Sequence, residues 1–204
     1  MLVPMRAILD AADKNGYAQG AFNVNAVCQV KAAVDVHQIL RSPAIIQGAD
    51  LANGFMGGRT DFANSTLEDK KAGAKNIGAA VKKYAADSDI PVALHLDHGK
   101  NFDSCVAAIE GGYTSVMIDG SSLPFDENVE LTREVVKYAH ERGVTVEGEL
   151  GVLAGVEDHV FAATSTYTNP LSAIDFFKKT GVDALDDQLR HHAWCKQRQE
   201  CSDP

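Results

Sequence analysis

A regular alternation of short apolar runs with longer helical patterns constrains the fold of this chain more than any other feature. Each apolar run is bounded by Gly, Pro or polar residues and is rich in Val, Ile or Ala. Continuous apolar runs of this length are typical of strands that are buried on both faces. The predicted strands are residues 18–24, 43–47, 90–96, 114–118 and 144–150.

Amphipathic or capped helical segments separate these strands. Ser65 lies three residues before Glu68, which predicts a capping box at the start of one helix. Pro170 follows Asn169 at the start of another, and several segments end at Gly. Strand–helix alternation predicts a parallel sheet, in either a doubly wound fold or a (β/α) barrel. The predicted helical segments are residues 25–42, 65–89, 101–112, 127–143 and 169–181.

Length and composition narrow the function classes. The 204 residues suit one domain, and the net charge of −9 disfavours nucleic acid and anionic membranes as partners. The N-terminal segment lacks the apolar core of a signal peptide, and no apolar run approaches the length of a membrane span. The four cysteines form no C-x-x-C pair, which is typical of reduced cytosolic thiols. We therefore expect a cytoplasmic protein.

Asp97 and His98 stand side by side where the predicted strand 90–96 ends. Ligands bind at the carboxyl ends of the strands in parallel α/β folds. A carboxylate beside an imidazole suits a general acid or base next to a metal ligand. The alternative is that Asp97 caps the following helix and His98 is partly exposed, and the spacing alone does not decide between the two.

Further carboxylates mark the next two strands. Asp119 comes directly after residues 114–118, and Glu147 and Glu149 are two apart on the next strand, hence on one face. Buried carboxylates need a partner, which is either a metal or a salt bridge to Lys or Arg. Because three successive strands carry these groups, the pattern favours one shared site.

Five segments taken together resemble the class II, metal-dependent fructose-bisphosphate aldolases and the related tagatose-bisphosphate aldolases. They run in family order from about residue 5 to about residue 185. The resemblance implies a (β/α)8 TIM barrel, a zinc ion, and aldol cleavage of a ketose 1,6-bisphosphate such as fructose 1,6-bisphosphate in glycolysis or gluconeogenesis. It implies a phosphorylated sugar as substrate, and homo-oligomers for the full-length relatives. The segments are "GAFNVN", "SPAIIQ", "PVALHLDHGKNFDSC", "GGYTSVMIDGSSLPFDENVELTREVVKYAHERGVTVEGELG" and "GVEDHV".

The resemblance also assigns roles to the strand-end residues. Asp97 matches the catalytic acid/base that moves a proton on the C4 hydroxyl side of the scissile bond. His98 matches the first ligand of the catalytic zinc, which polarises the substrate ketone. Asp119 and Glu149 match ligands of a second, nearby divalent metal site.

Four other positions complete the expected site. Glu157 matches a loop glutamate that takes part in proton transfer, and Asn23 lies near the substrate at the end of the first strand. His95 has no assigned family role and is interpreted as a structural histidine of its strand. Ala49 stands where many members have a substrate-facing Ser, so the resemblance does not carry that contact over to this chain.

The family pattern stops near Leu185, so residues 1–185 are expected to be the N-terminal part of a barrel of five to six βα units. Residues 186–204 match no part of the family and are expected to result from translation in a shifted reading frame. Synonymous codons for Asp187 to Cys201 exist whose neighbouring frame reads Gly-Thr-x-His-Gly, the family segment with the second zinc histidine. On this hypothesis His191, His192, Cys195 and Cys201 form no designed metal site.

Two alternatives remain beside an active aldolase. Only one of the three zinc histidines of the family is present, so the chain could be an inactive fragment of such an enzyme. An unrelated metal-dependent barrel, such as a hydrolase, is disfavoured because only His95 and His98 lie at a strand end. The residues do not separate a fructose-bisphosphate from a tagatose-bisphosphate aldolase.

Overall fold

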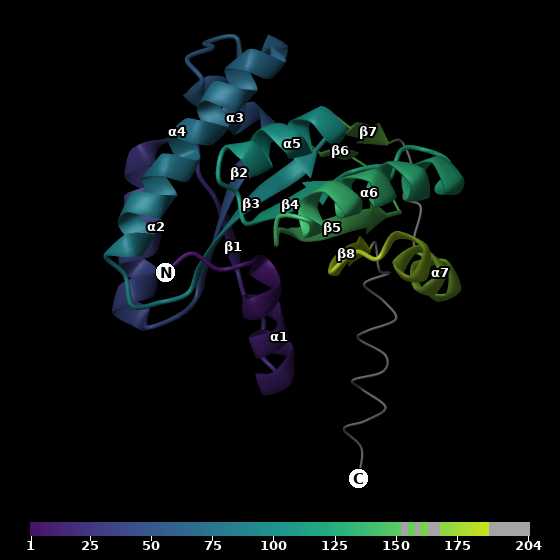
Figure 1. Ribbon diagram of the computed structural model, residues 1–204, viewed down its shortest axis with the longest axis horizontal. Coiled ribbons are helices and arrows are strands. Elements are labelled where there is room, and N and C mark those ends of the chain that lie inside the picture. Colours follow the sequence, from purple (N-terminus) through teal and green to yellow (C-terminus); the bar gives the residue numbers. More distant parts are fainter. Residues whose placement is uncertain (152–154, 158–159, 163–167, 188–204) are drawn as a thin grey trace.

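Six parallel strands form one sheet that curves into half of a barrel (Figure 1). The computed structural model of the protein describes residues 1–151, 155–157, 160–162 and 168–187. The strand order is β1-β2-β3-β4-β5-β8, so each crossover joins neighbouring strands as in a (β/α) barrel. The α/β class and the incomplete barrel are thereby confirmed. The strands are β1 Ala21–Asn23, β2 Ala44–Ala49, β3 Val92–Gly99, β4 Ser115–Ile118, β5 Thr145–Leu150 and β8 Ala184–Asp187.

Helices cover the outer face of the sheet (Figure 1). The five predicted helical segments are all present, with ends that differ by a few residues. None of the helices in the described part of the chain is both long and apolar enough to cross a bilayer. These helices are α2 Val27–Leu40, α4 Leu67–Ala86, α5 Phe102–Glu110, α6 Phe125–His140 and α7 Pro170–Thr180.

Several short elements were not predicted from the sequence. Helix α1 (Met5–Asn15) precedes the first strand, and helix α3 (Asp50–Met56) directly follows β2. A 3₁₀ turn, η1, spans Phe62–Asn64. A separate antiparallel pair, β6 (Gly155–Glu157) and β7 (Val160–Ala162), follows β5.

The apolar core lies on both faces of the sheet. The larger part packs the outer helices against strand residues such as Ile46, Leu94 and Val116, all of which are fully buried. A smaller cluster places Met5 and Ile8 of α1 against the other face. Helix α1 therefore closes the end of the half-barrel at which the strands begin, and chemistry is left to the opposite end.

The start of α4 corrects the predicted capping box. Ser65 ends the η1 turn, because its backbone N–H donates to the carbonyl oxygen of Phe62. The helix therefore begins one residue later, with Thr66 as the N-cap. Thr66 and Asp69 bond reciprocally, and Glu68 does not take the predicted part.

Candidate metal and acid–base site

His98, Asp119 and Glu149 meet where β3, β4 and β5 end. His98 Nδ1 lies 3.5 Å from Asp119 Oδ2 and 3.6 Å from Glu149 Oε2. One possible ligand atom from each residue lies within 4.8 Å of the others. Parallel strands bring these carboxyl ends to one edge of the sheet, as the sequence pattern predicted.

A local irregularity in β3 places His98 in this group. The register between β3 and β4 shifts between Leu96 and Gly99, and His98 adopts a left-handed φ of 47°. Such a conformation is unfavourable for a residue other than glycine and is often found at functional sites. A side chain at position 99 would meet the Met117 carbonyl oxygen at 2.6 Å, so Gly99 allows the strands to approach. The tight pairing fixes the backbone on both sides of the imidazole.

Hydrogen bonds hold Asp119, whereas one oxygen of Glu149 has none. Asp119 Oδ1 accepts from the backbone N–H of Ser121 at 3.0 Å and from its hydroxyl at 2.6 Å. Oε2 of Glu149 is buried and has no hydrogen-bond partner among the described residues. A buried oxygen without a partner is rare and calls for an explanation, such as an ion that it ligates.

The three residues of the cluster shift one another's pKa values. Its hydrogen bond with Asp119 raises the pKa of His98, and the charges of Asp97 and Glu149 act in the same direction despite burial. Burial raises the pKa of Glu149, and the neighbouring Asp119 charge adds to this. Burial would also raise the pKa of Asp119, but hydrogen bonds from His98 and Ser121 outweigh it and lower that pKa. One buried carboxylate, one partly buried carboxylate and one imidazole thus provide a donor set that suits a divalent cation.

The side chain of Asp97 faces strands β1 and β2. Its Oδ2 accepts a hydrogen bond from Asn23 Nδ2 at 2.8 Å, and its Oδ1 accepts one from Gln47 Nε2 at 3.0 Å. The N-cap of α5 is Asn101, whose side chain accepts from the Ser104 N–H. The alternative in which Asp97 caps this helix is therefore wrong. Gln47 was missed, and its only signal was a polar side chain inside an apolar strand.

A second buried polar group lies deeper in the sheet. His95 Nδ1 lies 2.8 Å from Ser115 Oγ, and its Nε2 lies 3.4 Å from Glu147 Oε2. Burial lowers the pKa of His95 to about 3, so its ring is neutral at pH 7. Burial, together with Asp186 and Asp97, raises the pKa of Glu147 to about 7. The carboxylates of β5 therefore face histidines, with Glu147 beside His95 and Glu149 beside His98.

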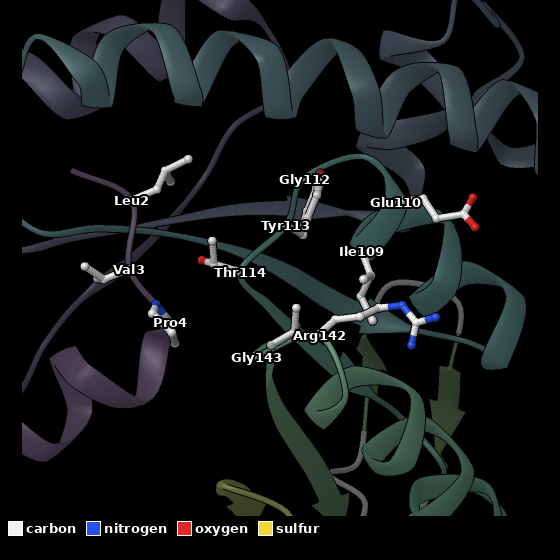
Figure 2. A pocket seen from close by; sticks show the side chains of 11 residues that line it. Leu2, Val3, Pro4, Ile109, Glu110, Gly112, Tyr113, Thr114, Arg142 and Gly143 are labelled. Carbon is white, nitrogen blue, oxygen red and sulfur yellow. The ribbon is translucent and has the colours of Figure 1, made fainter.

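Two cavities lie at opposite ends of the strands. One of about 440 Å³ is lined by Ala49, Phe55, Phe62 and Asn23, and the Asn23 amide donates to Asp97. The other, of about 420 Å³, lies where the strands begin, between the N-terminal segment and the turns before β4 and β5 (Figure 2). Of these two cavities, the first lies at the strand ends beside Asn23, on the Asp97 side of the candidate site.

Some predicted positions cannot be placed in the site. The backbone of Glu157 belongs to β6, but its side chain lies outside the described part of the structure. Residues 158–159 lie outside it as well. The tail residues His191, His192, Cys195 and Cys201 also lie outside the described residues. The expectations for Glu157 and for the tail therefore stay predictions.

The fold and site together define a class: parallel α/β barrel proteins with a histidine–carboxylate cluster at the strand ends. Residues 3–186 match the family described as fructose-bisphosphate aldolase class-II, so the chain belongs to the class II fructose-bisphosphate aldolase family. The predicted family is thereby confirmed.

Named relatives agree with this membership. The chain is 47% identical over 188 residues to the fructose-bisphosphate aldolase of Treponema pallidum. The aligned region covers 90% of this chain and 53% of that protein. The chain is 40% identical over 190 residues to the fructose-bisphosphate aldolase of Geobacillus stearothermophilus, covering 92% and 61%. The crystal structure of the YdjI aldolase from Escherichia coli K12 aligns with a TM-score of 0.72 at 30% identity, covering 92% and 60%. The chain thus spans about half to three fifths of the length of these relatives.

Proposed function

We propose that this chain carries the N-terminal half of the active site of a zinc-dependent aldolase that cleaves a ketose 1,6-bisphosphate. The single observation that carries the proposal is the cluster of His98, Asp119 and Glu149 beside an amide-held Asp97. The names of the relatives support fructose 1,6-bisphosphate as the substrate, with dihydroxyacetone phosphate and glyceraldehyde 3-phosphate as products. A tagatose bisphosphate is the alternative substrate.

His98, Asp119 and Glu149 would hold the metal. An imidazole nitrogen and carboxylate oxygens are ligands that zinc accepts, and Oε2 of Glu149, which has no hydrogen-bond partner among the described residues, fits that role. A bound divalent ion here supplies a Lewis acid for the substrate carbonyl. We assign all three side chains to one ion because their ligand atoms lie close together, and a second divalent ion would share Asp119 and Glu149.

Asp97 is the proposed acid/base. The amides of Asn23 and Gln47 orient both of its carboxylate oxygens, so that it can hold or release a proton at the C4 hydroxyl oxygen of the substrate. Asn23 also lines the adjacent cavity, which gives it a place beside the sugar. We keep Glu157 as a second proton-transfer residue, because the chain leads from the end of β5 to this position within a few residues.

A second candidate is that the 204 residues alone form a catalytically silent N-terminal part of such an aldolase. The observation that favours it is that, in the described part of the chain, the six-stranded sheet has two unpaired edges and the metal cluster contains one histidine. In this reading residues 1–185 are one part of a barrel domain. Binding of metal would then be weak, because tight zinc sites generally use three or four preorganised ligands.

A chelator-sensitive coupled assay for triose phosphate release tests both candidates. It would compare the 204-residue chain with a chain extended by the C-terminal part of the Treponema pallidum relative. We expect background turnover from the first and zinc-dependent turnover from the second. In the extended chain, Asp97→Ala should lower turnover and retain the metal, whereas His98→Ala should lose both.

Robust turnover by the 204-residue chain alone would overturn the second candidate. Equal loss of metal in the Asp97→Ala and His98→Ala variants would contradict the division of roles between these two residues. If the extended chain binds zinc but releases no triose phosphate from either bisphosphate, the proposed aldol reaction is wrong.

A further inference from the structure

We propose that Asn128 is a positioning residue for the metal cluster, because its buried side-chain amide fixes the backbone of the ligand residue Glu149. Asn128 lies on α6, which packs against β5 on the outer side of the sheet. It supplies no ligand atom to the cluster of His98, Asp119 and Glu149. The inference rests on the metal site of the proposed function, and it concerns binding of the cation and not the aldol reaction.

The pairing between β4 and β5 ends just before two of the ligand residues. The last paired residues are Ile118 and Gly148, and Asp119 and Glu149 each come one position later. Beyond that point Asp119 bonds toward β3, because its N–H donates to the Gly99 carbonyl oxygen, whereas Glu149 is paired with β8. The β4–β5 ladder therefore does not set the separation of the two carboxylates.

The side chain of Asn128 lies where this ladder ends. Its Nδ2 donates to the Glu149 carbonyl oxygen at 2.9 Å, and its Oδ1 accepts from the Thr132 hydroxyl at 3.1 Å. Because a carbonyl oxygen only accepts, the amide nitrogen must be the end that faces Glu149. Asn128 is 1% exposed and Thr132 is fully buried, so both bonds are shielded from water. The amide is thus held in one orientation against the β5 backbone.

The same amide contacts the turn that follows Asp119. A Cβ atom added at Gly120 would lie 2.3 Å from Asn128 Oδ1 and 2.8 Å from Asn128 Cγ. Gly120 therefore packs against the amide in a space that leaves no room for a side chain. Asn128 thus touches the turn of one carboxylate ligand and bonds the backbone of the other, so that one buried side chain links Asp119 to Glu149.

The alternative is that Asn128 only stabilises the fold. Asparagine is unfavourable inside a helix and is mostly exposed, so its burial on α6 requires compensating hydrogen bonds in either case. The two roles differ in what the loss of the amide changes. Groups that orient metal ligands typically contribute about tenfold to a hundredfold to metal affinity. A positioning role therefore predicts a loss of metal affinity that the loss of a buried hydrogen bond elsewhere does not cause.

The test is titration of the 204-residue chain with Co²⁺, followed by visible absorption, with Zn²⁺ as competitor. Asn128→Ala should weaken binding of both ions by about tenfold or more and should change the Co²⁺ absorption bands, which report ligand geometry. Tyr113→Phe is the matched control, because it removes a buried neutral hydrogen bond of 2.7 Å to Asn53 that involves no residue of the cluster. It should lower the urea midpoint and leave Co²⁺ affinity and absorption unchanged.

Gly120→Ala displaces the amide without deleting it, and it should also weaken Co²⁺ binding. In the Asn128→Ala background the same change should have a much smaller effect, because the amide atoms that the new Cβ would strike are gone. Thr132→Val removes only the hydroxyl that holds Oδ1 and should give a smaller loss of affinity. Circular dichroism establishes that each variant is folded. If Asn128→Ala does not fold, Gly120→Ala and Thr132→Val, both read against Tyr113→Phe, decide the question.

Wild-type Co²⁺ affinity and absorption in the folded Asn128 variant would overturn the proposal. A loss of affinity in Tyr113→Phe as large as in Asn128→Ala would do so as well. Equal effects of Gly120→Ala in both backgrounds would refute the link to Asp119. If the wild type binds no Co²⁺ that His98→Ala abolishes, the metal site fails and this role fails with it. If that binding is present and the Asn128 variants retain it, only the positioning role is wrong, so the two failures are distinguishable.

Discussion

The middle of the sheet and its two edges differ in almost every physical respect. Strands β3, β4 and β5 are paired on both sides and largely buried, and the candidate site lies at their ends. Strands β1 and β8 are paired on one side only among the described residues. The difference shows that the histidine–carboxylate cluster comes from three consecutive strands of the buried middle, whereas the edge strand β1 leaves an apolar side chain such as Phe22 exposed.

The largest expected effect is on the free energy of unfolding, and it comes from making the same Leu→Ala change in the two regions. Leu94→Ala, in the fully buried middle of β3, should lower the free energy of unfolding by about 2–5 kcal/mol, through lost burial and a residual cavity. Leu40→Ala, on the 69% exposed outer face of α2, should change it by about 0.5 kcal/mol or less. Urea denaturation measures both, and equal losses would refute the contrast between middle and edge.

The next effect concerns the cation that the middle of the sheet is proposed to hold. His98→Ala should weaken zinc binding by more than about tenfold, because it removes a direct nitrogen ligand of the cluster, and loss of a group that only orients a ligand already costs about tenfold to a hundredfold. Calorimetric titration of both proteins with zinc measures this loss. The control is His140→Ala, at an exposed histidine that pairs with Asp183 at the far end of the sheet. If His140→Ala weakened binding as much as His98→Ala, zinc would not be bound at the cluster.

A pH effect on stability should also arise from the middle of the sheet. The pKa of buried His95 is lowered to about 3, so its contribution to stability is fully present above the unfolded value near pH 6.5. It is lost as the pH falls, at up to about 1.4 kcal/mol per pH unit. The pKa of Glu147 is raised to about 7, so its contribution has the opposite sign and is lost as the pH rises from about 4.5 through 7.

His95→Gln therefore isolates the acidic side of this profile. The stability difference between the variant and the wild type should shrink as the pH falls from 6.5 to 5, because the wild type loses the His95 contribution and the variant does not. Urea unfolding at a series of pH values measures this difference. A constant difference across that range would show that folding does not lower the pKa of His95.

The smallest effect compares the two amides that hold Asp97. Gln47→Ala, on the paired strand β2, should cost about 1 kcal/mol, which is typical of one lost hydrogen bond. Asn23→Ala, on the exposed strand β1, should cost less, because water can replace its amide. If the order of these two losses in urea unfolding is reversed, β1 is better protected in solution than its open edge implies.

The sequence alone determined the class of the fold and the composition of the candidate cluster. Continuous apolar runs separated by helices permit little but a parallel sheet, and parallel strands carry their carboxyl ends to one edge. Asp97, His98, Asp119 and Glu149 could therefore be placed together before any distance was known. Family membership followed from the same segments, because their order and spacing are those of the class II aldolases.

Tertiary structure decided which of these groups touch. The amides of Asn23 and Gln47 on Asp97, and the pairing of His95 with Glu147, join residues far apart in the chain. The left-handed conformation of His98 could not be predicted either. The position of helix α1 could not be predicted from the sequence either. Its apolar side packs against Ile45 and Ala93, and that contact depends on the fold of distant segments. Local patterns fix the direction and spacing of strands, but register and inter-strand packing depend on contacts between distant segments, which the order of residues does not display.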